Sequence, residues 1–292
     1  MCLIAFAINA SARWPLVIAA NRDEFFDRPT LPLARWQAGS GQTIISGRDL
    51  RAGGSWLGIT PGGRVAFVTN VRQGQPQAAP WSRGDLVTRW LAQDLGADDF
   101  IDGLGPDSKA YGGFNLVLGD LQRQTWAWVS NLAGTAASGW QTRPLPAGIY
   151  GLSNAAMDTP WPKTRALKQV LADNLTGTAQ TLQIALWNAL ASRQRASRQQ
   201  LPSTGVPLEL EEGLSSAFVD LPERGYGTRC STLLLASAAD PDPGSWQVHM
   251  EERTHARTGH DASRPASRHS PVATESFALQ PLGAAGVAFK AA

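Results

Sequence analysis

Short apolar runs, separated by Gly, Pro and polar corners, make up most of the chain. The first two runs, at 3–8 and 16–20, flank a polar corner at 9–13, and this spacing predicts a β-hairpin. Turn residues, including those at 61–63 and 240–244, separate the later runs, so we expect antiparallel pairing. These later runs lie at 43–46, 55–59, 65–70, 114–118, 125–129, 149–154, 232–235 and 246–250.

Three segments have the spacing of amphipathic helices. Ser82 can cap a helix over 83–95, whose apolar positions fall on one face. Thr159 and Pro160 predict the start of a second helix, with Thr as the cap and Pro in the first turn. A third helix is predicted over 179–192. Because the second and third follow each other closely, we expect them to lie side by side on a sheet.

The order of strands, two central helices and further strands predicts an α+β fold, with antiparallel sheets packed face to face and helices outside. We expect a single domain over 1–253. The segment 192–206 is rich in Arg, Gln and Ser, and we expect it to be mobile. The segment 254–271 has almost no large apolar residue, which predicts disorder, and 272–292 is then a C-terminal extension.

Composition narrows the class of protein. The chain has 292 residues, of which 43% are hydrophobic, enough for a sizeable core. A formal net charge of +2 gives no reason to expect binding to nucleic acid or to acidic membranes. Two cysteines make no disulfide framework, no basic leader precedes the apolar start, and no apolar run approaches the ~20 residues of a membrane helix. We expect a soluble, cytoplasmic protein with no integral membrane segment, and the oligomeric state stays open.

Cys2 is the first candidate for chemistry. Removal of Met1, which a small second residue favours, would leave a thiol nucleophile and a free α-amine on one residue. An α-amine has a pKa of about 8, so it can accept the thiol proton near neutral pH. The alternative is a small buried thiol at the end of a strand, without a catalytic role.

The stretch Asn21-Arg22-Asp23-Glu24 ends the second apolar run. In a strand, Asn21 and Asp23 face one side while Arg22 and Glu24 face the other, so all four cannot point at Cys2. We expect Asp23 to hold the α-amine of Cys2, and Arg22 and Glu24 to be available for a structural ion pair. The alternative is a solvated, charged strand end.

Three residues further along the chain can complete such a site. Asn70 and Asn154 each end an apolar strand and can donate amide N–H groups to an oxyanion, although Asn at strand ends also serves turns. Arg229 precedes a buried strand and can bind a substrate carboxylate or an acidic side chain. We expect its neighbour Cys230 to be a core thiol.

Other patterns give weaker alternatives. Ser153, Asp220 and His249 occur in the order of an α/β-hydrolase triad, but the Gly-x-Ser-x-Gly motif lacks its last Gly. No phosphate-binding glycine motif is present, and the tryptophans are expected to pack the core. We therefore expect no cofactor and no metal. The spacing of the four histidines, His249, His255, His260 and His269, matches no common metal site. The last three of them fall in the expected tail.

Several motifs resemble those of the NRDE family, also called the transport and Golgi organisation protein 2 family. The resemblance runs in order from residue 1 to about 253 and excludes 192–206. It rests on Met1-Cys2, Asn21-Arg22-Asp23-Glu24-Phe25, Arg28-Pro29, Gly47-Arg48-Asp49, Gly53-Gly54-Ser55-Trp56-Leu57-Gly58, Thr69-Asn70-Val71-Arg72, Ser82-Arg83-Gly84, Phe114-Asn115-Leu116, Tyr150-Gly151-Leu152-Ser153-Asn154, Asp158-Thr159-Pro160-Trp161-Pro162-Lys163 and Tyr226-Gly227-Thr228-Arg229.

The resemblance implies an N-terminal-nucleophile (Ntn) hydrolase-like fold, a four-layer αββα sandwich. The family is similar in outline to bile-salt hydrolases and penicillin V acylases, in which a Cys at position 2 is the nucleophile. In those acylases two residues separate the Arg from the Asp, whereas Arg22 and Asp23 are adjacent here, so Asp23 is the firmer counterpart. The implied catalytic residues are Cys2, Asp23, Asn70, Asn154 and Arg229, and the expected supporting or substrate-binding residues are Asn21, Arg22, Glu24, Arg72 and Trp56.

Two functions follow from these residues and the resemblance. The first is an N-terminal-cysteine hydrolase or acyl-transfer enzyme that acts on a small amide or thioester through an acyl-enzyme at Cys2. The second is a carrier without turnover, which serves haem trafficking or binds an acyl-CoA or lipid in a pocket lined by aromatic and arginine side chains. In both cases the expected partner is a small molecule.

Overall fold

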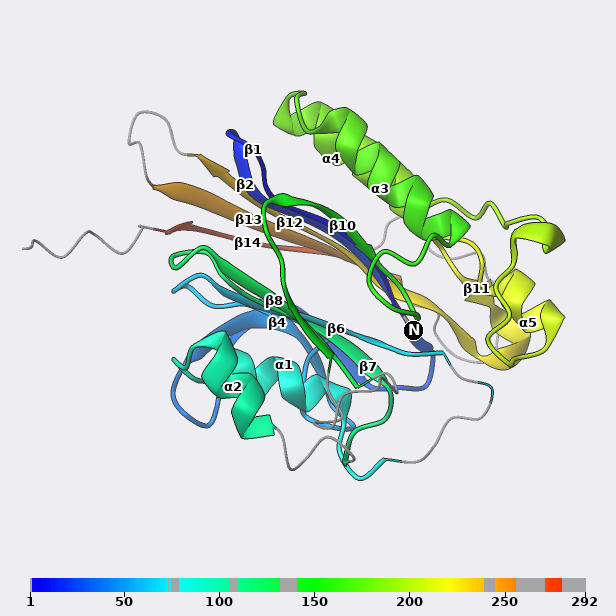
Figure 1. Ribbon diagram of the computed structural model, residues 1–292, viewed down its shortest axis with the longest axis horizontal. Helices are drawn as coiled ribbons and strands as arrows, with labels where there is room; N and C mark the ends of the chain where they lie inside the picture. Colours follow the sequence, from blue (N-terminus) through cyan, green and yellow to red (C-terminus); the bar gives the residue numbers. More distant parts are fainter. Residues whose placement is uncertain are drawn as a thin grey trace, which may run out of the picture.

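Two antiparallel sheets face each other in the computed structural model, which describes residues 2–72, 74, 79–104, 110–131, 141–238, 245–255 and 271–279 (Figure 1). The first sheet has the strand order β10-β1-β2-β12-β13-β14, with β11 paired to β12. Its strands are β1 (Cys2–Ser11), β2 (Trp14–Phe25), β10 (Gly148–Leu152), β11 (Asp220–Leu221), β12 (Tyr226–Ala238), β13 (Trp246–Thr254) and β14 (Val272–Leu279).

The second sheet follows chain order from β3 to β9, so each strand lies next to its neighbour in sequence. Its strands are β3 (Thr30–Gln37), β4 (Thr43–Asp49), β5 (Leu57–Ile59), β6 (Arg64–Asn70), β7 (Phe114–Asp120), β8 (Thr125–Ser130) and β9 (Gln141–Pro144). The turn residues between apolar runs predict such hairpins, and the one long connection of this sheet with described helices lies between β6 and β7.

The core explains why the apolar runs are nearly continuous. In β1, Ile4 and Phe6 face the second sheet, while Leu3 and Ala5 face the helices that cover the outside. Strand residues alternate between faces, so a strand covered on both sides must be apolar at almost every position.

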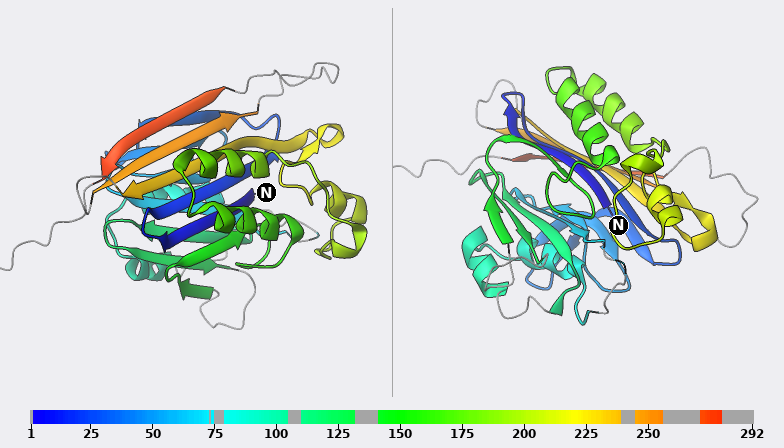
Figure 2. Two further views of the ribbon diagram at one scale, coloured as in Figure 1. Left: turned by 90° about the horizontal axis from the view of Figure 1, so that it is seen from above. Right: turned by 45° about the vertical axis from the view of Figure 1, so that its right-hand side comes forward.

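Paired helices cover the outer face of each sheet. The helices α3 (Pro162–Asn174) and α4 (Ala179–Leu190) pack side by side on the first sheet, as predicted (Figure 2). The helices α1 (Arg83–Leu91) and α2 (Ala97–Leu104) pack against the second sheet. The result is four layers in the order αββα, which confirms the predicted fold class.

The helix ends differ in detail from the prediction. α1 stops at Leu91, before the predicted Leu95, whose carbonyl accepts a hydrogen bond from Arg64. α3 begins at Pro162 with Trp161 at the N-cap, so the prediction that Thr159 caps it is wrong. The Thr159 hydroxyl instead donates to the carbonyl of Ala156.

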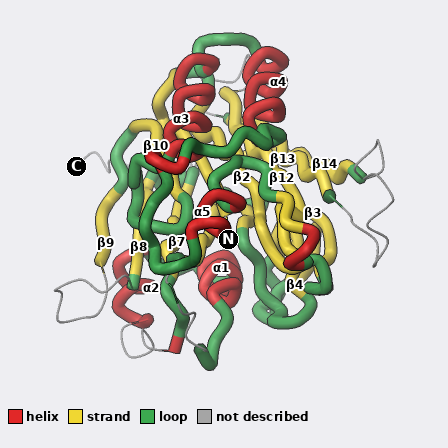
Figure 3. The backbone as a smooth tube through the Cα atoms, turned by 90° about the vertical axis from the view of Figure 1, so that its right-hand side faces the viewer, coloured by secondary structure: helices red, strands yellow, loops and turns green. Residues whose placement is uncertain are grey.

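Short elements cluster at one end of the sandwich, next to the start of the chain (Figure 3). They are the helix α5 (Leu208–Gly213) and the 3-10 turns η2 (Arg198–Gln200) and η3 (Pro222–Arg224). The prediction of a mobile segment over 192–206 is therefore wrong. The Ala196 amide donates to Ser215 Oγ at 2.9 Å, and the Thr204 amide donates to Glu211 Oε1 at 3.0 Å.

The C-terminal part of the chain also departs from the prediction. His255, expected in a solvated tail, donates its amide to the Arg229 carbonyl and packs its ring against Phe218. The strand β14 comes from the expected extension and pairs with β13 along its length, so the sheet continues past residue 253. The rest of the expected disordered segment and extension, 256–270 and 280–292, lies outside the described residues.

Candidate active site

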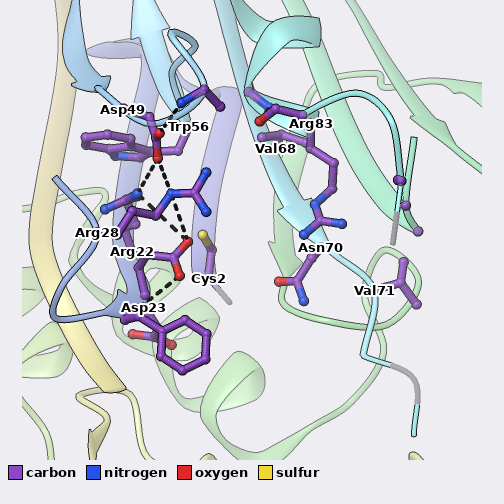
Figure 4. A pocket seen from close by; sticks show the side chains of 18 of the residues that line it. Cys2, Arg22, Asp23, Arg28, Asp49, Trp56, Val68, Asn70, Val71 and Arg83 are labelled. Carbon is purple, nitrogen blue, oxygen red and sulfur yellow. Dashed lines mark hydrogen bonds and ion pairs between the residues drawn. The ribbon is translucent and has the colours of Figure 1, made fainter. Parts of the chain in front are cut away.

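Cys2 lies at the free end of β1, where it lines a cavity of about 2000 Å³ at the end of the sandwich (Figure 4). The cavity walls come from the ends of β2 and β6, the start of α1, the start of β12 and the helix α5. The Cys2 side chain packs with the inner core and is half-buried. Cys2 therefore forms part of the cavity wall.

The surroundings of the Cys2 thiol favour its protonated form. Burial raises its pKa above the ordinary value of 9.0, and the nearby Asp23 carboxylate raises it further, against the opposing charge of Arg22. Because the thiolate is the nucleophilic form, a reaction at Cys2 requires a base to take this proton.

Asp23 lies on β2, one residue beyond Arg22, which is the ladder partner of Cys2. Leu3 opposes Asn21 and Cys2 opposes Arg22, so the backbone nitrogen of Cys2 points along the strand toward the Asp23 end of β2. Asp23 is 1% exposed, and its Oδ1 accepts a hydrogen bond of 2.7 Å from Thr228 Oγ1. Burial raises the pKa of Asp23, and the positive charge of Lys163 is a major opposing influence.

Arg22 connects the two sheets. Its Nη2 lies 3.1 Å from Asp49 Oδ2 on β4 and 3.9 Å from Glu24 Oε2, and its guanidinium stacks over the Trp56 ring at 4.2 Å. Arg28 contacts the same Asp49 carboxylate. The ion pair expected for Arg22 and Glu24 is therefore present, within a larger network that forms one wall of the cavity (Figure 4).

Asn21 points away from this cavity. Its Nδ2 donates to the carbonyls of Leu190 and Ala217, and its Oδ1 accepts from Ser231 Oγ. These contacts join β2 to α4 and to the loop that follows α5. Asn21 thus holds the sheet against its helical layer, as the alternation of side chains along β2 requires.

Asn70 faces Cys2 from the opposite sheet, and Asn154 lies behind it. Asn154 is fully buried, and its Nδ2 donates to Asn70 Oδ1 at 2.9 Å and to the Asn70 carbonyl at 3.0 Å. This leaves the Asn70 Nδ2 as the amide donor on the cavity wall. Next to Asn154, Ser153 Oγ donates to the Cys2 carbonyl at 3.0 Å, which fixes the end of β1.

The two later arginines have different positions. Arg72 lines the cavity, forms an ion pair with Glu211 of α5, and stacks over Trp161 at 4.8 Å. Arg229 is not among the described residues that line the cavity. Its Nη1 donates to the carbonyls of Phe25, Phe26 and Arg28, so it clamps the turn after β2.

Two basic residues near Cys2 were not predicted to belong to the site: Arg83 lines the cavity, whereas Lys163 lies outside the cavity lining, near Asp23. Arg83 is the first residue of α1, and the Ser82 cap was the signal that places it there. Lys163 lies behind Asp23 on α3, where its Nζ donates to the Leu214 carbonyl at 2.9 Å. Burial lowers the pKa of Lys163 to about 8. A buried lysine is rare without a nearby carboxylate, but no sequence signal identifies that partner.

The alternative sites do not assemble. Ser153, Asp220 and His249 have separate partners, namely the Cys2 carbonyl, Arg193 and Ser276. Within the described ranges, no group of His, Cys, Asp and Glu side chains is arranged to hold a metal ion. None of the helices described here has the length and apolar character needed to cross a bilayer.

Fold and site together define the class of protein: a four-layer αββα sandwich with a cysteine at the free end of an inner strand. The chain belongs to the Transport and Golgi organisation 2 family, whose model matches residues 1–256.

Relatives and solved structures place the chain among known proteins. It is 30% identical over 283 residues to the human Transport and Golgi organization protein 2 homolog, covering 87% of this chain and 99% of the human one. The mouse homolog is 28% identical over 277 residues, with 87% and 99% covered.

Among solved structures, the C2A mutant of conjugated bile acid hydrolase from Clostridium perfringens has a TM-score of 0.48 at 8% identity, covering 95% of this chain and 97% of that one. The Caenorhabditis elegans ortholog of N-acylethanolamine-hydrolyzing acid amidase has a TM-score of 0.47 at 11% identity, with 80% and 92% covered.

Proposed function

We propose that this protein is an N-terminal-cysteine hydrolase or acyl-transfer enzyme that acts on a small amide or thioester. The observation that carries the proposal is the position of the Cys2 thiol, half-buried at the end of β1 and facing a large cavity. The proposed first requirement is loss of Met1, which converts the Cys2 nitrogen into a free α-amine.

The α-amine is the base of the proposed reaction. It accepts the Cys2 thiol proton, and Asp23 beside the Cys2 nitrogen orients it by charge and hydrogen bonding. The positive charge of Lys163 behind Asp23 favours the neutral form of the amine, which is the form that acts as a base.

The thiolate then attacks the substrate carbonyl. A C–S bond forms, the carbonyl electron pair moves to oxygen, and the Asn70 Nδ2 donates to the resulting oxyanion. Collapse of this intermediate breaks the C–N or C–S bond of the substrate, and the α-ammonium returns its proton to the leaving group. Water, activated by the same amine, releases the acid; a different acceptor would make the reaction an acyl transfer.

The buried hydrogen bonds of Asn154 support this assignment of roles. Both oxygens of Asn70 accept from Asn154 Nδ2, so the Asn70 amide nitrogen is held in one orientation. In this proposal Asn70 touches the reacting oxygen, and Asn154 is a positioning residue. Arg229 is also a positioning residue in this proposal, because its guanidinium contacts the turn that follows β2 and not the reacting atoms.

A fusion that hides Cys2 tests the requirement for a free amine. A cleavable peptide is placed before Cys2, and amide and thioester panels are screened by mass spectrometry before and after its removal. The proposal expects product release only after cleavage, and none from the cleaved Cys2→Ala protein. Equal turnover before and after cleavage would show that the α-amine is not the base.

A carrier is the second candidate, favoured by the size of the cavity. Its volume of about 2000 Å³ exceeds the range of roughly 300–1,000 Å³ usual for small-molecule pockets. Titration with haem and with long-chain acyl-CoA, on wild type and on Cys2→Ala, separates the candidates. Binding that survives Cys2→Ala, without any hydrolysis by wild type, supports the carrier.

A further inference from the structure

Among the described residues Arg83 has no acidic partner, which sets it apart from every other cavity arginine except the exposed Arg224. No ion pair or hydrogen bond of its guanidinium is found with the residues that the structure describes, and its side chain is half-buried. The exposed Arg224 lies on η3. All the remaining arginines that line the cavity have a carboxylate oxygen within ion-pair distance: Arg22, Arg28, Arg51, Arg72 and Arg89.

A half-buried guanidinium without a partner among the described residues is unfavourable. Burial lowers the pKa of Arg83, although the neighbouring Cys2 and Glu24 favour its charged form. Arginine nevertheless keeps its charge in proteins, so the cost of desolvation is not relieved by loss of a proton. A bound anion would offset that cost and use the planar N–H groups of the guanidinium.

The fold fixes the direction of Arg83. A Cβ on Gly54 would lie 2.4 Å from the carbonyl carbon of Gly84, so only glycine allows the 53–55 turn to approach α1 this closely. From this anchored helix start, the Arg83 side chain extends along the wall opposite Arg22 and ends near Asn70 (Figure 4). The guanidinium therefore faces the Cys2 thiol across the cavity.

We propose that Arg83 binds an oxyanion group of the substrate, a carboxylate or a phosphate, close to the carbonyl that Cys2 attacks. The substrate class is then a small anionic amide or thioester. That the bound anion is part of a substrate rests on the function proposed above, whereas the existence of an anion site next to Cys2 does not.

Two alkylating probes of similar size and different charge test the site without requiring turnover. Iodoacetate carries a carboxylate, whereas iodoacetamide is neutral, and both alkylate a thiolate with loss of iodide. The rate of alkylation at Cys2 is followed by peptide mass mapping, which separates it from the buried Cys230. The ratio of the two rates is compared with that of free cysteine.

The wild-type ratio of iodoacetate to iodoacetamide rates is expected to exceed the free-cysteine ratio about tenfold, from a charge-assisted contact to Arg83 in a partly solvated cavity. Arg83→Met and Arg83→Gln return the ratio to that of free cysteine, and Arg83→Lys keeps part of the preference. Arg51→Met is the matched control, because Arg51 is an exposed lining residue paired with Asp27. Its ratio stays at the wild-type value.

Two outcomes overturn the proposal. One is a ratio that Arg83→Met leaves unchanged. The other is an equal loss of both rates, because Arg83 would then act on the Cys2 thiolate and not on the anion of the probe.

Competing anions identify the group that is bound. Butyrate and inorganic phosphate are each tested for protection of Cys2 against iodoacetamide. The site is supported if either anion protects wild-type Cys2 and this protection disappears in Arg83→Met. The anion that protects at the lower concentration shows whether a carboxylate or a phosphate is preferred. The proposal is contradicted if protection persists in Arg83→Met, or if neither anion protects wild-type Cys2. Because alkylation needs neither Met1 removal nor an acyl-enzyme, this result is independent of whether the protein proves to be an enzyme.

Discussion

Replacing Arg22 by methionine tests whether this arginine is mainly structural. The side chain is 6% exposed, donates to Asp49 on the facing sheet at 3.1 Å, and covers the Trp56 ring at 4.2 Å. Methionine retains most of the apolar contact of the arginine stem. The substitution therefore removes the charge and its hydrogen bonds while it leaves the volume nearly filled.

The expected loss follows from what remains around Asp49. Its carboxylate keeps Arg28 and the amides of Arg51 and Ala52, at 3.0 and 2.9 Å, so it does not become an orphaned buried charge. What is lost is a charge-assisted hydrogen bond worth about 1.5–3 kcal/mol. A cation–π contact worth about 0.5–2 kcal/mol is lost with it. We expect Arg22→Met to lower the free energy of unfolding by about 2–5 kcal/mol, the sum of the two losses.

Urea denaturation followed by tryptophan fluorescence measures this change. Arg83→Met is the matched control, because its guanidinium has no partner among the described residues and its removal should cost less than about 1 kcal/mol. If Arg22→Met unfolds at the wild-type midpoint yet abolishes reaction at Cys2, the structural role is wrong and Arg22 belongs to the reacting site.

Four further substitutions probe the cavity and the residues around it. Asn70→Ala should slow acylation of Cys2 about 100-fold because it removes the oxyanion donor, whereas Asn154→Ala should slow acylation less and should destabilise the fold. Stopped-flow kinetics measure the first effect and denaturation measures the second. Equal kinetic losses in the two variants, without destabilisation, would contradict these roles. Burial lowers the pKa of Lys163 from 10.5 to about 8, so its charged form is disfavoured in the folded state and the stability it contributes should rise by up to about 3 kcal/mol between pH 8 and 10.5. The difference in unfolding free energy between wild type and Lys163→Met should follow that window, and a flat difference would show that the lysine is not buried. Gly54→Ala should displace the start of α1 and lower the free energy of unfolding by about 1–3 kcal/mol. It should also reduce the iodoacetate preference of Cys2. An unchanged preference would mean that the contact between Gly54 and Gly84 does not position Arg83.

The sequence predicts the sandwich well where strands are covered on both faces. The runs at 3–8 and 16–20 pair as expected, because their apolar residues can be buried on either side. β3 and β14 are missed because both have many exposed or half-buried positions, and β3 also contains Pro32. The helices α2 and α5 are missed because they are too short to show a period.

The orientation of a site side chain can be predicted from the sequence where strand alternation holds, and not where the strand is irregular. The opposite orientations of Asn21 and Arg22 follow from alternation alone. Arg229 does not, because the β2–β12 register shifts between Thr228 and Cys230 and leaves Arg229 as the extra residue. Such a bulge redirects a side chain, here toward the carbonyls of the turn after β2. Arg83 reaches the cavity and Lys163 reaches Asp23 from helices, whose placement depends on packing between layers.

The most direct test of the account is the mass of the protein after a brief reaction with a butyryl thioester of N-acetylcysteamine, quenched in acid. The account predicts a chain that lacks Met1 and carries one butyryl group, mapped to Cys2 and absent in Cys2→Ala. It also predicts that the adduct decays as butyrate is released or transferred. A protein that turns over the thioester with Met1 still in place, or that does so equally well as Cys2→Ala, would contradict it.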